Sequence, residues 1–128
     1  MRVLNRLILS LLLIGSACLM SGYAVAGEAN VTKAVATEQG SNAWRFDVTI
    51  RSNDKGWDYY CDRFEIVAPD GTVLGTRILV HPHETEQPFT RSLRGVSIPA
   101  SIETVTVRAS MKPDGAGGDT VQLKLRDK

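Results

Sequence analysis

The sequence predicts an all-β protein that folds as a single immunoglobulin-like or fibronectin III-like β-sandwich of about seven strands. Apolar and polar residues alternate with a period of two over much of the chain, as expected for strands with one buried face. No stretch after the N-terminal segment has the i, i+3, i+4, i+7 apolar spacing of an amphipathic helix. Turn signals recur at intervals of roughly 8 to 12 residues, which is typical of a sandwich. A small β-barrel is the structural alternative.

The predicted strands differ in the strength of their alternation. The clearest lies at 44–51, where the residues that share the expected buried face are Trp44, Phe46, Val48 and Ile50. The stretches that alternate in the same way or more weakly are 102–111, 121–125, 31–37 and 89–93. An Asp70-Gly71 pair joins two further apolar stretches, 57–68 and 72–80. Because Asp-Gly readily adopts the positive φ angles of tight turns, it predicts a hairpin.

The strand before this hairpin contains a change of register. Cys61 lies on one face by alternation, whereas Phe64 and Ile66 have the opposite parity. A β-bulge, which puts one extra residue into a strand, would bring both sets to the same face. We therefore expect a bulge near Asp62, and we expect the core to contain Trp44, Phe46, Phe64 and Ile66.

The first 26 residues have the pattern of a secretory signal peptide. Arg2 and Arg6 give a charged start, residues 7–14 are apolar except for Ser10, and residues 24–26 supply the small side chains that precede a cleavage site. The apolar run is too short to persist as a membrane-spanning helix, which needs about 20 apolar residues.

We therefore expect residues 1–26 to be the signal peptide and residues 27–128 the β-sandwich domain, with cleavage near Ala26. The mature chain is expected in the periplasm or outside the cell. Small residues also precede Cys18, so a lipoprotein anchored through this cysteine is the alternative.

The charge balance argues against nucleic acid as a partner. The chain has 15 basic and 14 acidic residues, and loss of Arg2 and Arg6 changes the formal charge from +1 to −1. The basic residues do not cluster in the way that a phosphate-binding surface requires.

Cys61 is expected to be a buried, unpaired thiol. The other cysteine, Cys18, lies in the segment that is cleaved or lipidated, so no internal disulfide can form. Free cysteine is among the most buried residue types. No nucleophile elbow is present, and Cys61 lies on a strand rather than at a helix start. We therefore expect the protein not to be an enzyme.

Both histidines lie in the string HPHETEQPF, at residues 81–89. Proline 82 favours an extended backbone at His81, so the side chains of His81 and His83 are expected on the same side. Imidazole is a common ligand of zinc and copper, and Glu84 or Glu86 could add an oxygen ligand. The sequence thus allows a copper or zinc site, although catalytic zinc needs three protein ligands and structural zinc four.

A structural role explains the same string without a ligand. A chain that crosses between the sheets of a sandwich needs a stiff connection with few backbone donors, and Pro82 and Pro88 each remove one. A binding surface beside this connection is also possible, because arginine and tyrosine are favoured at binding hot spots. The candidates for that surface are Asp58, Tyr60, Arg77, Arg91 and Arg108.

The strings WDYYCDRFEIVAPDGTVLGTR and HPHETEQPFTRSL resemble a family of small exported bacterial proteins of unassigned function. The resemblance covers about residues 56–111 and implies export and a compact β domain, with no settled activity or ligand. In that family the loop before the Gly-Gly pair often carries another histidine, where this chain has Lys112, Pro113 and Asp114. A three-histidine metal site is therefore not expected in this member.

Two functions follow as hypotheses. The first is an exported, non-catalytic binding or interaction module that presents the HPHETEQPF connection to an unknown protein or small ligand. The second is a copper- or zinc-binding protein that uses His81 and His83 with Glu84 or Glu86.

Overall fold

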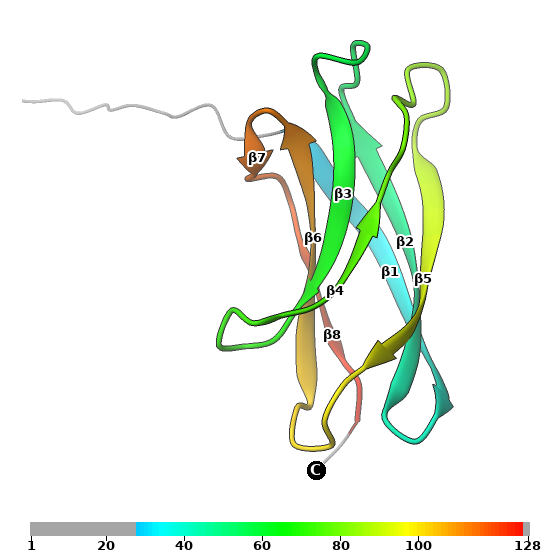
Figure 1. The fold of residues 1–128 in the computed structure, drawn as a ribbon, viewed down its shortest axis with the longest axis vertical. Helices are drawn as coiled ribbons and strands as arrows, with labels where there is room; N and C mark the ends of the chain where they lie inside the picture. Colours follow the sequence, from blue (N-terminus) through cyan, green and yellow to red (C-terminus); the bar gives the residue numbers. More distant parts are fainter. Residues whose placement is uncertain (1–27, 127–128) are drawn as a thin grey trace, which may run out of the picture.

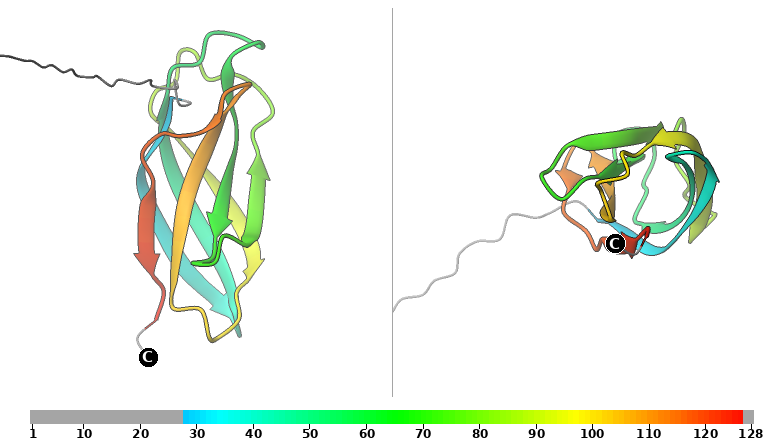
Figure 2. Two further views of the ribbon diagram at one scale, coloured as in Figure 1. Left: turned by 90° about the vertical axis from the view of Figure 1, so that its left-hand side faces the viewer. Right: turned by 90° about the horizontal axis from the view of Figure 1, so that it is seen from below.

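The computed structural model describes residues 28–126, which form two antiparallel β-sheets packed face to face. Figures 1 and 2 show the two layers. The strands are β1 (Ala29–Gly40), β2 (Ala43–Ser52), β3 (Tyr60–Val67), β4 (Val73–Ile78), β5 (Phe89–Ser97), β6 (Thr104–Lys112), β7 (Gly115–Ala116) and β8 (Val121–Lys124). The predicted β-sandwich is confirmed, and the sheets do not close into a barrel. The described residues hold eight strands rather than about seven, because the short β7 pairs with β6.

One sheet has the strand order β1-β2-β5, and the other has the order β4-β3-β6, with β7 and β8 both pairing with β6. The chain therefore changes sheets between β2 and β3, between β4 and β5, and between β5 and β6. The connection with the two histidines is the second of these crossings, as predicted. The expected signal peptide, its cleavage site near Ala26 and Cys18 lie outside the described residues.

Alternation produces the core. In β2 the buried residues are Trp44, Phe46, Val48 and Ile50, and in β6 they are Val105, Val107, Ala109 and Met111. Phe64 and Ile66 of β3 complete the centre of the core from the second sheet. Within residues 28–126, no helix is long and apolar enough to cross a membrane.

The bulge in β3 is confirmed at Asp62. Cys61 pairs with Met111 and Arg63 pairs with Ser110, which leaves Asp62 as the extra residue. The inserted residue turns the strand over, so Cys61 is buried on the same side as the core residues that follow it, Phe64 and Ile66.

The start of β3 differs from the prediction. The strand begins at Tyr60 rather than at 57, because residues 57 and 58 belong to a turn in the connection 53–59. Trp57 is consequently 62% exposed, and the edge of its ring contacts Tyr60 at a centroid distance of 5.7 Å.

The Asp-Gly turn between β3 and β4 is confirmed, with a connection that runs from Ala68 to Thr72. The Ala68 amide donates to the Thr72 carbonyl at 2.8 Å, and the Gly71 amide donates to the Ala68 carbonyl at 2.9 Å. The Asp70 carboxylate accepts from the Thr72 amide at 2.9 Å. Gly71 has a φ of 93°, a conformation that side chains other than glycine rarely adopt.

Candidate functional site

The two histidines lie in the connection 79–88 between β4 and β5. Figure 1 shows this connection at the same end of the sandwich as the connection between β2 and β3. The imidazole rings of His81 and His83 are 4.6 Å apart between centroids, so the expectation of neighbouring rings is confirmed. Their environments differ, since His81 is exposed and His83 is 4% exposed.

His83 is a neutral, packed imidazole. Its ring stacks on Phe89 at 3.9 Å between centroids, and its Nε2 lies 3.1 Å from Nη2 of Arg91. Because a guanidinium only donates hydrogen bonds, Nε2 must be the acceptor and Nδ1 carries the proton. Burial and the charge of Arg91 both lower the pKa of His83. Its Nδ1 has no hydrogen-bond partner and faces the Asp54 carboxylate at 3.9 Å.

Asp54 links three segments at this end of the sandwich. Its side chain is fully buried. Its carboxylate accepts from the Ser52 hydroxyl at 2.7 Å, the Cys61 amide at 3.0 Å and the His83 amide at 2.8 Å. One side chain thus joins the end of β2, the start of β3 and the connection 79–88. Hydrogen bonds to a charged acceptor are stronger than neutral ones, which suits this role.

Gln87 completes the same network from the other end of the connection. Its Oε1 accepts from the Ser52 amide at 2.8 Å, and its Nε2 donates to the His83 carbonyl at 2.9 Å and to the Ser52 hydroxyl at 3.1 Å. We call Ser52, Asp54, His83 and Gln87 the polar clamp. The clamp fixes the backbone of the connection on both sides of the glutamates.

The two glutamates proposed as metal ligands point to solvent. Glu86 accepts from Nη2 of Arg91 at 3.1 Å, and this hydrogen bond lowers the pKa of Glu86. Glu84 is exposed. Among residues 28–126, no three His, Cys, Asp or Glu side chains are grouped so that they could hold a metal ion. The metal site therefore stays a prediction, for which the structure supplies the pair of neighbouring imidazoles.

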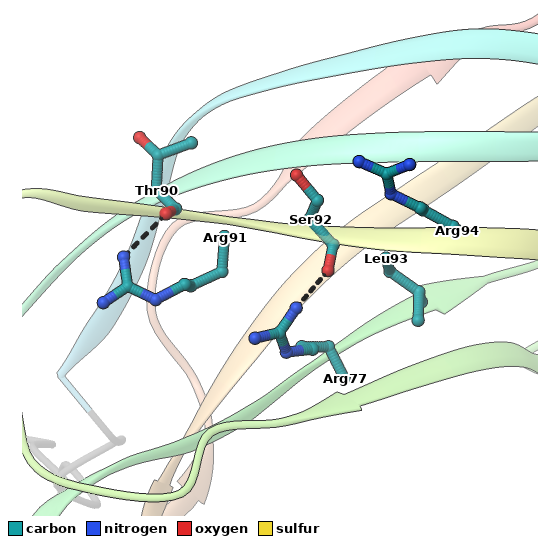
Figure 3. A pocket seen from close by; sticks show the side chains of 6 residues that line it. All are labelled: Arg77, Thr90, Arg91, Ser92, Leu93 and Arg94. Carbon is teal, nitrogen blue, oxygen red and sulfur yellow. Dashed lines mark hydrogen bonds between the residues drawn. The ribbon is translucent and has the colours of Figure 1, made fainter.

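The five proposed surface residues are brought together only in part. Arg77 and Arg91 line the same hollow of about 500 Å³ between β4 and β5 (Figure 3). Arg108 instead pairs with Glu65 at 2.8 Å in the second sheet. Asp58 is exposed in the connection 53–59. The expectation of an exposed Tyr60 is wrong, because its side chain packs under Trp57 and Lys112 and is 9% exposed.

The prediction of a buried, unpaired Cys61 is confirmed. Burial, followed by the negative charge of Asp54, raises the pKa of the thiol to about 12. The thiol is therefore protonated at neutral pH, and its hydrogen-bond contact is the Arg63 carbonyl at 3.7 Å. A protonated, buried thiol is a poor nucleophile and a poor metal ligand.

Sequence reasoning missed Asp54 and Gln87. Asp54 lies among Ser, Asn, Asp, Lys and Gly residues that resemble any solvated turn. Gln87 stands between an exposed glutamate and a proline. Nothing in either local pattern distinguishes a buried hydrogen-bonding side chain from an exposed one.

The comparisons with known proteins give one distant relationship. No family model matches the sequence, and no solved structure matches it. A protein named "Putative lipoprotein" from Halomicrobium mukohataei is 36% identical over 94 residues, which is 73% of this chain and 46% of that protein. The chain thus spans about half the length of this curated relative. The family resemblance carried by the HPH string stays a prediction.

Proposed function

We propose that this chain is an exported, non-catalytic binding module that engages its partner with the end of the sandwich formed by residues 53–59 and 79–88. The observation that carries the proposal is the polar clamp. Asp54 accepts from the His83 amide and Gln87 donates to the His83 carbonyl, so the backbone of the connection 79–88 is held at His83. A surface that is ordered before binding loses less conformational entropy when a partner binds.

The exposed face of this end has the side chains that binding requires. Trp57 is 62% exposed in the connection 53–59, and Val80 is 72% exposed in the connection 79–88, where His81 follows it and is exposed as well. Large apolar residues are costly to leave in water, and aromatic residues are enriched at the centres of interfaces. The polar clamp would hold in place the segments that carry these exposed side chains.

The absence of catalysis is part of the proposal. The candidate base His83 accepts from Arg91, and the candidate nucleophile Cys61 is protonated and buried. Triad chemistry needs a base whose free nitrogen contacts an accessible nucleophile, and neither condition suits these two residues.

Export is supported by the signal pattern and by the name of the relative. Because the relative is named a lipoprotein, anchoring through Cys18 competes with cleavage near Ala26. Mass spectrometry of the mature chain tests this point. A mature chain that begins at Gly27 supports the free form, and one that begins at a lipid-modified Cys18 supports the anchored form.

Site-specific photo-crosslinking tests the binding surface. A photoreactive amino acid is placed at Val80 or Trp57 of the full chain, in the cells that naturally make it. The matched control places it at Thr72, which is exposed in the turn between β3 and β4. We expect a discrete adduct from 80 and 57 and none from 72. Equal crosslinking at all three positions, or none at any, would refute the proposed surface.

A copper- or zinc-binding function is the second candidate. The observation in its favour is the 4.6 Å separation of the two imidazole rings. Metal at His83 Nε2 would have to displace Arg91, which also holds Glu86. Titration with copper or zinc decides, with His81→Ala and His83→Ala as controls. Binding tighter than millimolar that disappears in the double variant, and that weakens as pH falls through about 6.5, would support this function.

A further inference from the structure

The hollow beside the clamp lies between two strand edges. β4 is the edge strand of one sheet and β5 the edge strand of the other, and they approach each other on one side of the sandwich. Side chains of β5 lie against Gly75 of β4, where an added Cβ would meet Leu93 and Val96 side-chain carbons at 3.1 Å. Towards the start of β5 lies a hollow of about 500 Å³, lined by Arg77, Thr90, Arg91, Ser92, Leu93 and Arg94.

Two arginines cover backbone carbonyls along this edge. Arg77 of β4 donates to the Ser92 carbonyl, and Arg91 donates to the Thr90 carbonyl at 2.8 Å. In Figure 3 both side chains lie on the same side of β5, and Arg94 lies on the other. The two carbonyls are two residues apart, which is about 6.8 Å along an antiparallel strand. The guanidinium groups are therefore held in a row parallel to the strand.

The lining of the hollow is cationic, since three of its six residues are arginines and none is acidic. On the side of β5 that carries Arg77 and Arg91, Arg91 already holds one carboxylate, that of the exposed Glu86, at 3.1 Å. Arg77 donates to a carbonyl, so this contact neutralises none of its charge. A guanidinium has five donors in a planar fork that fits a carboxylate, and the contact with Ser92 uses one of them. The Ser92 hydroxyl donates to the Asp47 carboxylate, and its side chain lies on the side of β5 opposite to Arg77.

We propose that this hollow binds an extended acidic peptide segment, with carboxylates two residues apart that meet Arg77 and Arg91. The carboxylate that meets Arg91 would take the place of the Glu86 carboxylate. Side chains at i and i+2 of an extended strand point to the same side and are about 6.8 Å apart, which matches the row of arginines. A single small oxyanion would meet only one guanidinium. In antiparallel strands the amide and carbonyl of a residue point to the same edge, so the amides of Thr90 and Ser92 also face the hollow. Such a peptide would lie along the edge of β5.

This inference rests on the proposed binding function and names the chemistry of the partner. Its test measures fluorescence anisotropy of labelled nine-residue peptides with the mature protein. One peptide, TETETETET, alternates Thr and Glu, and the second, EETTEETTT, has the same composition but no two glutamates at i and i+2. Oligogalacturonate of equal charge represents an acidic polysaccharide. We expect the alternating peptide to bind about tenfold more tightly than the second peptide, with affinity falling as salt rises.

Substitutions that remove one positive charge at different positions identify the site. Arg77→Gln should weaken binding of the alternating peptide about tenfold, as expected for the loss of one charge-assisted pair. Arg77→Lys, which keeps the charge and loses the fork, should weaken it by less. Lys33→Gln is the control, because it removes the same charge from exposed β1, at the far edge of the three-stranded sheet.

Three outcomes would overturn the inference: equal affinity for the two peptides, equal effects of Arg77→Gln and Lys33→Gln, or tightest binding of oligogalacturonate. The crosslinking experiment separates this result from the proposed function. Failure of the peptides with crosslinks retained at Val80 would refute the acidic ligand alone. Loss of those crosslinks with peptide binding intact would refute the partner surface at residues 53–59 and 79–88 alone.

Discussion

The two ends of the sandwich are held by different kinds of hydrogen bond. The Asp-Gly turn at 68–72 is closed by backbone bonds and by one exposed carboxylate that reaches two residues along the chain. The polar clamp is closed by side chains that are buried, as in Asp54 and His83, or half-buried, as in Gln87. Asp54 reaches His83 over 29 residues, and Gln87 reaches Ser52 over 35. The contacts of the first end are local and exposed to solvent, whereas those of the second are non-local and largely shielded from it.

This difference predicts at which end the loss of a hydrogen bond lowers the free energy of unfolding most. An exposed group that loses its partner exchanges it for water, whereas a buried group that loses its partner remains unpaired. The clamp end should therefore be sensitive to changes of one or two atoms, and the turn should tolerate them. That contrast agrees with the proposed binding function, which needs the clamp end to be ordered before a partner binds.

The largest expected effect comes from Asp54→Asn. The side-chain amide cannot accept from all three donors, so at least one buried donor is left unpaired, and the free energy of unfolding should fall by about 3 kcal/mol. Urea denaturation measures it. The control is the same exchange at Asp70, where asparagine can still accept from the Thr72 amide and the urea midpoint should not move. Equal shifts in the two variants would abolish the contrast between the ends.

Gln87→Ala should have the next largest effect, about 2 kcal/mol, because it leaves the Ser52 amide and the His83 carbonyl without their partners. Gln39→Ala is the control. Gln39 is exposed and accepts from the Gly95 amide at 3.2 Å, so water can replace it. Thermal or urea unfolding of both variants compares them, and a loss at Gln39 as large as that at Gln87 would contradict the importance of burial.

Gly71→Ala should cost about 1 kcal/mol, from backbone strain rather than from a lost contact. Its φ is 93°, and an added Cβ has no atom within 4 Å. Hydrogen exchange should show faster exchange of the Ala68 and Gly71 amides and unchanged protection of the His83 amide. Gly40→Ala, without a positive φ, should leave all three unchanged. Loss of protection at His83 in Gly71→Ala would mean that the two ends are coupled.

The smallest expected effect is a pH dependence confined to the clamp end. The folded pKa of His83 is lowered by burial and by Arg91, whereas the unfolded value is near 6.5. As pH falls below about 6.5, the unfolded chain binds the proton first, so stability declines until the folded pKa is reached. Urea unfolding at pH 7 and pH 5 measures the decline. The variant His83→Phe should lose the part of this decline in stability that His83 causes, and the variant His81→Gln should retain it. The opposite result would exclude His83 as the titrating group.

The sequence predicted those features whose causes lie close together along the chain. Alternation predicted the buried face of β2, the Asp-Gly pair predicted its turn, and the conflict of parity between Cys61 and Phe64 predicted the bulge at Asp62. The extended HPH string likewise predicted that the two imidazoles would be neighbours. In each case the interacting residues are separated by only a few positions.

The candidate site could be predicted only in outline, since its contacts depend on how the sheets are stacked. Arg91 reaches His83 Nε2 from the first residues of β5, and Asp54 faces His83 Nδ1 from the connection 53–59. Neither approach changes the local pattern of apolar and polar residues. The sequence did not predict the burial of Tyr60 for the same reason, because the residues that pack on it are Trp57 and Lys112, the latter at the end of β6.

The state of Cys61 has a consequence for the production of this protein. Because the thiol is buried and its pKa is raised to about 12, the folded domain offers no thiolate to oxidants or to other disulfides. Residues 28–126 contain no second cysteine, so their folding requires neither a thiol oxidase nor a disulfide isomerase. The same domain can therefore be prepared in reducing or oxidising surroundings, and its folded form should be identical in both.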